Sequence, residues 1–327
     1  MTLLSRPLAR RLAILVALAP LALAAACAGD DALNSDGGGD AGGGEGGGGR
    51  EVVVGGQNFT EMLIMAEIYK GILEGADYDV TLKLVESRDV YTPEMQKGRV
   101  DVSADYLSSM TEFLNAQVNG PDAEPVASND ADATVEELRK LAEPTGIEPL
   151  EPAAAQDANG FAVTKEFAEQ NDLATLSDLA ELGDPVTLAA AEDCSERDDC
   201  KVGLEEVYGL DISRVEPLGF GTQGTKDALV EGEVVLGQVG TTDPAIKALD
   251  LVMLEDDKEL QNAENLVPMV NSEFLDANPG VADILNEMSS GLTTAALAEM
   301  IGKVDVERQL PEDVAHEYLV DTGLIAG

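Results

Sequence analysis

Three short stretches of this sequence carry residue types that could bind or react with another molecule. The first holds Gln57, Asn58 and Thr60, which follow a β-branched run ending at Gly55–Gly56 and precede an apolar segment with helical spacing. Backbone N–H groups at the start of a helix attract polar or anionic groups, so this stretch predicts a ligand contact. The alternative is a simple βα turn, in which Asn58 or Thr60 caps the helix and Glu61 completes a capping box.

The second stretch holds Cys194 and Cys200, two of the three cysteines in the chain. An even pair within a short loop of an exported chain predicts a disulfide, which would fix the local conformation of that loop. The third stretch, Asp256–Asp257, resembles a pair of calcium ligands, but no EF-hand spacing surrounds it. We interpret it as a solvated turn, and we expect no metal and no cofactor.

Composition and motifs argue against two classes of function. The chain carries 63 acidic and 20 basic residues, for a net charge of −43, which repels nucleic acid and anionic membrane surfaces. The acidic residues run along the whole length, so we interpret them as a solvated surface. The sequence holds one histidine, His316, and neither a G-x-S-x-G nor an H-E-x-x-H motif. These features argue against an enzyme.

Residues 1–26 have the features of an export signal. Three arginines precede the apolar run 12–26, which is too short to span a bilayer, and Cys27 follows directly. The small residues before Cys27 resemble a bacterial lipobox, which implies a lipid on Cys27 and an anchor to the cell membrane. Ordinary secretion after cleavage near an Ala-x-Ala site is the alternative. Residues 27–50, rich in glycine and aspartate, read as a flexible tether.

The remaining chain alternates between strand and helix patterns, which predicts an α/β fold with largely parallel sheets. A proline-containing segment at 148–154 predicts a crossing between two lobes. We assign 51–153 with 260–327 to the first lobe and 154–259 to the second. Strands are expected at 52–54, 80–84, 100–104, 161–164, 186–190, 215–218 and 234–239. Helices are expected after Thr60, at 88–97, 107–116, 165–170, 177–182, 201–208, 225–231, 281–289, 293–302 and 312–321. A further helix, capped by Thr134 with Glu137, is expected to end before Pro144.

In this order, the motifs resemble those of the extracytoplasmic binding proteins of ABC importers for glycine betaine, choline, carnitine and proline. The similarity covers essentially all of 51–327. Its main segments are Gly56-Gln-Asn-Phe-Thr-Glu61, Gly98-Arg-Val-Asp-Val-Ser-Ala-Asp-Tyr106, Phe161 to Ala168, Cys194 to Gly209, Thr242-Asp243, Leu254-Glu-Asp-Asp257 and Pro268.

The resemblance implies a two-lobed periplasmic-binding-protein fold of type II, with the ligand in a cleft between the lobes. It also implies an aromatic box that holds a quaternary ammonium by cation–π contact. Tyr106, after Asp105, matches a box tyrosine. Gly240 stands where betaine binders commonly place another one. Aromatic residues make up only 4% of the chain, so a different small solute is an open alternative.

We predict that the first lobe supplies Gln57, Asn58, Thr60, Tyr91, Asp105 and Tyr106 to the site, and the second Asn159, Phe161, Arg197, Thr222, Gln223 and Thr242. Strand ends and helix starts carry these residues, and open α/β sheets bind ligands there. The resemblance implies a monomer that delivers a quaternary amine to a permease and an ATPase. The alternatives are the same fold binding an amino acid or polyamine, and a tethered sensory module.

Overall fold

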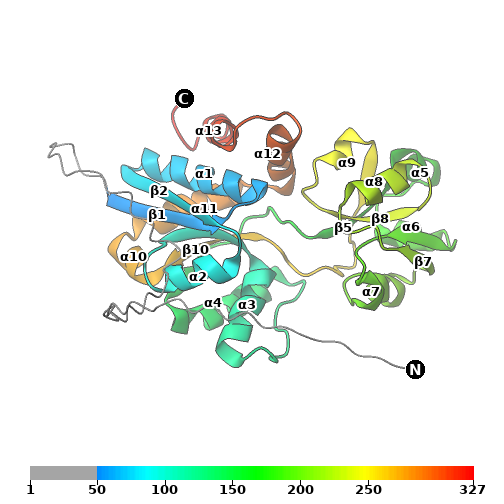
Figure 1. Cartoon of the computed structure of the whole chain (residues 1–327), viewed down its shortest axis with the longest axis horizontal. Coiled ribbons are helices and arrows are strands. Elements are labelled where there is room, and N and C mark those ends of the chain that lie inside the picture. The colour runs from blue at the N-terminus through cyan, green and yellow to red at the C-terminus, as the bar shows by residue number, and fades with distance from the viewer. Residues whose placement is uncertain (1–49) are drawn as a thin grey trace, which may run out of the picture. The chain divides into compact units, whose positions relative to one another are not determined.

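The computed structural model describes residues 50–327, and these form two five-stranded sheets with helices packed against them (Figure 1). The strands of the first sheet come from residues 50–149 and 266–271, and those of the second from residues 159–254. Within this range, no helix is long and apolar enough to cross a membrane. Cys27, the predicted signal and the predicted tether up to residue 49 lie outside the described residues.

The first sheet is mixed, not largely parallel as the sequence predicts. Its order is β2 (Tyr78–Val85), β1 (Arg50–Gln57), β3 (Val102–Tyr106), β10 (Leu266–Asn271) and β4 (Ile147–Pro149). Strand β1 runs parallel to β2 and β3, whereas β10 runs antiparallel to β3 and β4. The reason lies in the return of the chain from the second sheet. It enters β10 at Leu266, opposite Tyr106 at the end of β3, and must therefore run backwards.

Eight helices of the described chain belong to the first lobe. They are α1 (Thr60–Gly75), α2 (Arg88–Gln96), α3 (Leu107–Asn119), α4 (Ala131–Ala142), α10 (Ser272–Ala277), α11 (Gly280–Gly291), α12 (Thr294–Asp305) and α13 (Pro311–Asp321). A short 3-10 turn, Glu143–Thr145, follows α4. The apolar face of α1 packs into one core with Val52 and Val54 of β1 and with residues of α11, α12 and α13. This packing fixes the start of α1 beside the ends of the strands.

Two predicted helix caps are wrong. Helix α1 begins after Phe59, and no side chain caps it. Glu61 does not complete a capping box, because its side chain is buried and turned toward the interior. Helix α4 begins earlier than predicted, after Asp130, whose carboxylate accepts from the N–H of Ala133. The predicted cap, Thr134, lies inside that helix and is buried.

The second sheet has the same mixed design. Its order is β7 (Ile212–Glu216), β6 (Val186–Ala189), β8 (Leu236–Gly240), β5 (Asn159–Thr164) and β9 (Leu251–Leu254). Strand β6 is parallel to β7 and β8, and β5 is antiparallel to β8 and β9. The helical segments are α5 (Lys165–Asn171), α6 (Leu176–Glu181), η2 (Cys194–Glu196), α7 (Lys201–Gly203), η3 (Leu204–Tyr208), α8 (Gln223–Val230) and α9 (Ala245–Ala248). Cys194 and Cys200 are buried in this lobe and joined by a disulfide.

Two crossing segments, residues 150–158 and 255–265, connect the sheets. They pair with each other, because Gln156 forms a bridge with Asn265 and the N–H of Asp157 donates to the carbonyl of Glu264 over 3.1 Å. The predicted lobe boundaries at 153/154 and 259/260 fall inside these segments. Those boundaries stay a prediction.

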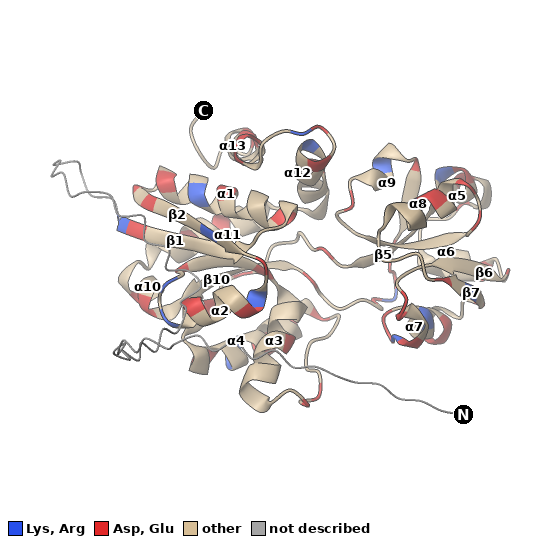
Figure 2. Ribbon diagram, in the orientation of Figure 1, with Lys and Arg blue, Asp and Glu red and all other residues tan. Residues whose placement is uncertain are grey.

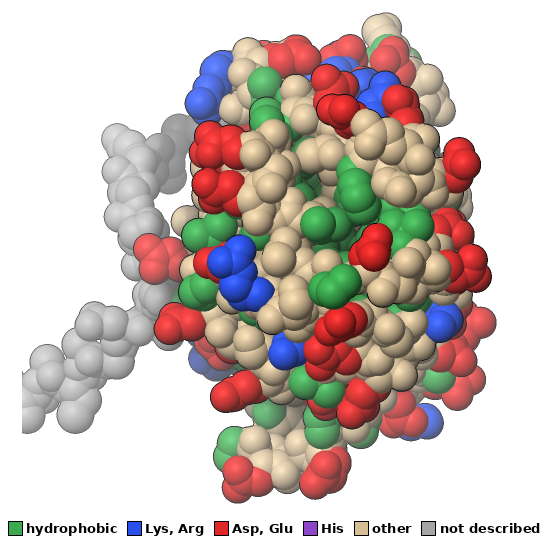
Figure 3. Space-filling model, turned by 90° about the vertical axis from the view of Figure 1, so that its right-hand side faces the viewer, with side chains coloured by type: hydrophobic (Ala, Val, Ile, Leu, Met, Phe, Trp, Pro, Cys, Tyr) green, Lys and Arg blue, Asp and Glu red, His purple; other side chains and the backbone are tan. Residues whose placement is uncertain are grey.

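Acidic side chains are distributed over the helices and loops of both lobes (Figure 2). On the face drawn in Figure 3, separate Asp and Glu side chains surround smaller groups of hydrophobic ones, with few Lys and Arg between them. This distribution agrees with a solvated acidic surface and not with a single acidic patch.

Candidate functional site

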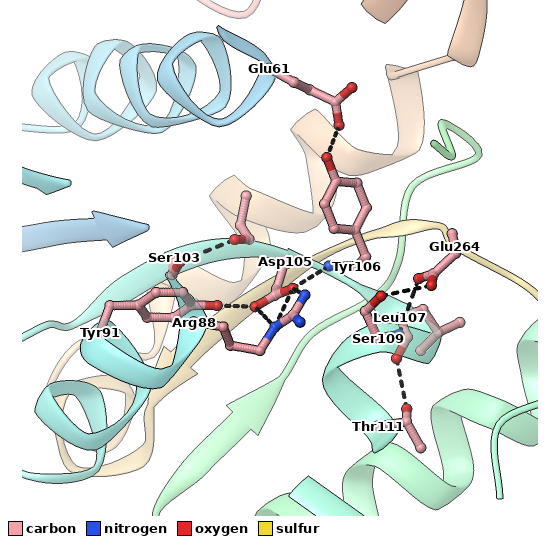
Figure 4. Close-up of polar contacts among 11 residues, drawn as sticks. Glu61, Arg88, Tyr91, Ser103, Asp105, Tyr106, Leu107, Ser109, Thr111 and Glu264 are labelled. Atoms are coloured by element: carbon pink, nitrogen blue, oxygen red, sulfur yellow. Dashed lines mark hydrogen bonds and ion pairs between the residues drawn. The ribbon is translucent and has the colours of Figure 1, made fainter. Parts of the chain in front are cut away.

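The candidate site begins with Glu61, a buried carboxyl in the first turn of α1. Its side chain is only 3% exposed, and its Oε1 accepts a hydrogen bond from the Tyr106 hydroxyl over 2.6 Å (Figure 4). Its Oε2 has no hydrogen-bond partner among the described residues. The pKa of Glu61 is raised from 4.5 to about 7, mainly by burial and also by the charge of Asp157, while hydrogen bonding by Tyr106 and Thr242 opposes this rise.

Asp157 is a second carboxyl of the site, half-buried in the crossing segment and close enough for its charge to act on Glu61. Burial raises its pKa, and its Oδ1 has no hydrogen-bond partner among the described residues. Thr242, which is 6% exposed, lies close enough to both carboxyls to lower both pKa values. We call Glu61, Tyr106, Asp157 and Thr242 the carboxyl cluster. It joins the start of α1, the end of β3, a crossing segment and the loop after β8.

Asp105 is fully engaged inside the first lobe. Its carboxylate accepts from the guanidinium of Arg88, with Nε 2.9 Å from Oδ2, and from the hydroxyl of Tyr91 (Figure 4). It also accepts from the N–H of Tyr106 over 2.7 Å. Asp105 is 1% exposed and Tyr91 is completely buried. Asp105 and Tyr91, both predicted site residues, are therefore buried and hold the backbone of Tyr106 in place.

Glu264 ties the second crossing segment to the first lobe. Its Oε1 accepts from the Ser109 hydroxyl over 2.7 Å, and its Oε2 accepts from the Ser109 N–H over 3.1 Å. Burial raises the pKa of Glu264, while the bonds from Ser109 and the charge of Arg88 lower it. This contact holds the segment next to Tyr106.

In the second lobe, Asn159 and Arg197 meet on Asp199. The Asn159 amide donates to Oδ2 of Asp199 over 2.9 Å, and Arg197 Nε donates to Oδ1 over 2.8 Å. The Gln238 amide donates to the side-chain oxygen of Asn159 over 3.4 Å, and the Gln261 amide donates to the backbone carbonyl of Asp199 over 2.8 Å. Arg197 therefore pairs within its own loop, with Asp199 and, over 3.7 Å, with Asp193.

The other predicted residues are engaged elsewhere or exposed. The Thr60 hydroxyl donates to Asp305 over 2.8 Å, and Gln223 donates to Asp227 over 2.7 Å. Thr222 caps α8, and Phe161 is 1% exposed in the core of the second lobe. Gln57 is half-buried and Asn58 exposed at the end of β1.

Asp256 and Asp257 are not merely solvated. Asp256 accepts from the Tyr208 hydroxyl and from the N–H groups of Leu260 and Gln261, and Asp257 accepts from the N–H of Ser177. These bonds hold the start of the second crossing segment. No group of three or more metal-ligating side chains occurs in residues 50–327.

A pocket of about 700 Å3 lies beside the crossing segments. Asn159 and Phe161 line it, together with Gln156, Gln261 and Asn265, but the carboxyl cluster does not. We place the candidate site at the carboxyl cluster, because Glu61 and Asp157 each have a buried oxygen without a hydrogen-bond partner. The pocket, by contrast, is lined by no charged residue that is buried. Buried polar atoms without partners are costly, so such a group points to a ligand or a proton.

Sequence reasoning missed several residues of this arrangement, namely Glu61 as a site residue, Arg88, Asp157, Asp199, Gln238 and Glu264. The spacing that suggested a cap for Glu61 could equally have marked an inward-facing acid after a strand end. Asp157 and Thr242 come together only through the fold, and no local pattern signals them.

The two mixed five-stranded sheets define a type II periplasmic-binding-protein fold. A solved structure of apo YehZ from Escherichia coli matches it with a TM-score of 0.74 at 25% identity, covering 84% of this chain and 99% of that one. A solved glycine betaine/carnitine/choline ABC transporter structure has a TM-score of 0.72 at 20% identity, covering 84% of this chain and 99% of that one, and supports the same fold.

Residues 50–321 match the family of substrate-binding domains of ABC-type glycine betaine transport systems, and the chain belongs to that family. It is also similar to the glycine-betaine-binding protein of Pseudomonas aeruginosa, with 27% identity over 281 residues, covering 83% of this chain and 88% of that protein. The chain is therefore an extracytoplasmic binding component of an ABC importer and not an enzyme. The resemblance seen in the sequence is confirmed.

Proposed function

We propose that this protein captures a small quaternary amine, such as glycine betaine, choline or carnitine, and delivers it to a permease and ATPase in the membrane. The observation that carries the proposal is the family match, which spans residues 50–321 and so includes both lobes and both crossing segments. The carboxyls of the buried Glu61 and the half-buried Asp157 support it, because a permanent cation would offset their charge. We expect the binding component to act as a monomer.

We retain the predicted contacts as part of this proposal. In the first lobe, Tyr106 is half-buried beside Glu61 and offers a ring to a methylated cation. In the second lobe, Asn159 begins β5 directly after the first crossing segment, and Thr242 lies in the loop after β8, close to Glu61. Asp105, Tyr91 and Arg197 would contribute by holding these residues in place.

Calorimetric titration of the purified mature protein tests this function. The ligand panel contains glycine betaine, choline, carnitine, proline, a neutral amino acid and a polyamine. Saturable binding of at least one quaternary amine, with weaker binding of proline, the neutral amino acid and the polyamine, supports the proposal. Binding of only the polyamine or the amino acid would instead favour a different small polar solute. Absence of binding to every quaternary amine would refute the proposal.

We also propose that a lipid on Cys27 anchors the protein at the outer face of the cell membrane. The small residues before Cys27 and the glycine-rich stretch after it support this reading. In the native host, Cys27→Ser should release the protein from the membrane fraction or leave it uncleaved, whereas Ala28→Ser should behave as wild type. An unchanged mass and unchanged fractionation of Cys27→Ser would contradict the anchor.

A further inference from the structure

Phe220 is an aromatic side chain held in an exposed position beside the carboxyl cluster. It is 47% exposed and lies in the loop between β7 and α8. Gly219 and Gly221 flank it with φ of 100° and 57°, a backbone region that favours glycine. Their N–H groups donate to the carbonyls of Ala190, over 2.8 Å, and Gln238, over 3.0 Å. The loop is therefore held against the residue that follows β6 and the middle of β8, and the backbone on both sides of the ring is fixed.

Gly240, the last residue of β8, leaves a space that Phe220 and Asp157 share. A Cβ atom at Gly240 would lie 3.3 Å from Asp157 Oδ1 and 3.6 Å from Phe220 Cζ. The unpartnered oxygen of Asp157 and the tip of the Phe220 ring therefore face the same point. The φ of Gly240 lies outside the left-handed region, so its backbone does not require glycine. What the glycine provides here is room.

The cluster around this space carries excess negative charge. Glu61 is buried and Asp157 half-buried, each has a buried oxygen without a partner, and the charge of Asp157 raises the cost of ionising Glu61. Two carboxyls in such surroundings need a proton or a cation between them. An aromatic face attracts a methylated ammonium, which cannot donate an ordinary N–H bond. The chemistry of the cluster therefore suits a cation that is apolar at its surface.

The basic groups next to the cluster are already paired. Arg88 is paired with Asp105, and Lys226 with Asp243 over 2.7 Å. Each pair leaves little net positive charge to receive the carboxylate of a zwitterion. A ligand with a carboxylate would also bring a third negative group toward Glu61 and Asp157. Net charge therefore distinguishes the possible quaternary amines at this site.

We propose that the site selects a quaternary amine of net positive charge, of the choline class, over a zwitterion such as glycine betaine. The trimethylammonium head lies against Phe220 in the space left by Gly240 and faces the carboxylates of Glu61 and Asp157. This inference rests on the proposed function, and it adds the charge of the ligand and three residues that recognise it.

The test compares choline and glycine betaine, which share a trimethylammonium head and differ in the carboxylate. Calorimetry on the mature protein at pH 8 should give at least tenfold tighter binding of choline. Phe220→Leu should weaken choline binding by about tenfold, the loss expected for one desolvated cation–π contact. Glu61→Gln should weaken choline binding by about tenfold but change glycine betaine binding much less, since only the cation loses a net attraction.

Matched controls separate these effects from general damage. Phe167→Leu removes a half-buried ring from the same lobe, and Glu67→Gln removes a charge from the same helix, α1. Both should bind choline like wild type. If Glu61→Gln does not fold, Asp157→Asn takes its place, with the same expected loss.

The outcomes distinguish this inference from the proposed function. If wild type binds glycine betaine as tightly as choline or more tightly, the charge selection is wrong while the proposed function stands. The same holds if Phe220→Leu and the carboxyl variants bind choline like wild type. If wild type binds no quaternary amine, the proposed function itself fails, and this inference fails with it.

Discussion

The hydroxyl of Tyr106 donates a hydrogen bond to Oε1 of Glu61 over 2.6 Å and so joins the end of β3 to the first turn of α1. Burial raises the pKa of the Tyr106 phenol well above its ordinary value, and the Glu61 carboxylate adds to this, so the hydroxyl keeps its proton. The bond satisfies one of the two Glu61 oxygens. Tyr106 thus connects β3 to α1 and leaves Oε2 of Glu61 without a hydrogen-bond partner, so a ligand that approaches this oxygen would act on both elements.

Replacing Tyr106 by phenylalanine should destabilise the fold by about 1–3 kcal/mol at pH 8, because both oxygens of a buried carboxylate then lack a donor. The loss should be smaller at pH 5, where Glu61 is protonated. Urea unfolding at the two pH values measures both. Tyr318→Phe is the matched control, since the Tyr318 hydroxyl has no partner among the described residues. Equal losses in the two variants would contradict a specific role for the Tyr106 hydroxyl.

The pair of Arg88 and Asp105 should behave as a buried ion pair. Asp105→Asn leaves the Arg88 guanidinium, 19% exposed, without its carboxylate and should cost about 3–5 kcal/mol. Adding Arg88→Met to that variant should recover part of the loss, because no unpaired charge then remains. Denaturant unfolding of the two single variants and the double variant gives the coupling free energy.

A solvent-exposed ion pair serves as the comparison for the Arg88–Asp105 variants. Arg139 and Glu151 are 2.8 Å apart, with side chains 41% and 66% exposed. Glu151→Gln should cost no more than about 1 kcal/mol, as is typical of surface pairs. A similar cost for Asp105→Asn and Glu151→Gln would show that Asp105 is not held as the structure describes.

The fold follows closely from the sequence where the signals are local. The run Val52–Val54, the glycines after it and the apolar spacing of α1 fix one βα unit, and the structure has it. Strands β4, β9 and β10 and helices α9 and α10 were missed. Strand β10 contains Pro268, which has no N–H for a ladder bond and so weakens a strand prediction, yet β10 lies between β3 and β4 in the sheet.

The candidate site follows less closely, because its contacts are long-range. Spacing alone cannot say whether Glu61 caps its helix or turns inward. The answer depends on Tyr106, which β3 brings alongside from 45 positions away. From the sequence we predicted that Thr222 and Gln223, at the start of α8, belong to the site. In the structure it is instead the ring of Phe220, in the loop between β7 and α8, that lies next to Gly240. Such neighbours become visible only once the sheets are assembled.

Removing the disulfide should cost about 2 kcal/mol, the value expected when a loop this short is no longer closed in the unfolded chain. The variant is Cys194→Ser with Cys200→Ser, and urea unfolding with and without reductant measures the effect. Reductant should lower the stability of wild type, once it has been unfolded and refolded, to that of the variant, and should not affect the variant. A wild type that is insensitive to reductant under these conditions would contradict the bridge.

Glu61 should also make the stability of the protein depend on pH. Its pKa rises from 4.5 to about 7 on folding, so the folded state binds this proton more tightly than the unfolded chain does. The stability that this proton supplies is complete below pH 4.5 and is lost as the pH rises through about 7. The difference between the two pKa values corresponds to about 3 kcal/mol. Asp157, whose pKa is also raised, acts in the same direction.

The measurement is the free energy of unfolding in urea between pH 4.5 and 8.5, for wild type and for Glu61→Gln. Wild type should lose stability relative to the variant across this range, with most of the loss between about pH 5 and 7. Glu67→Gln, in the same helix at a side chain paired with Lys70, should follow the wild-type profile, because it leaves the buried carboxyl in place. Choline at saturating concentration should flatten the wild-type profile, since a bound cation offsets the ionised carboxylates that the pH rise creates. Parallel profiles for wild type and Glu61→Gln would mean that Glu61 titrates as an ordinary surface carboxyl, and the buried cluster would then have no electrostatic basis.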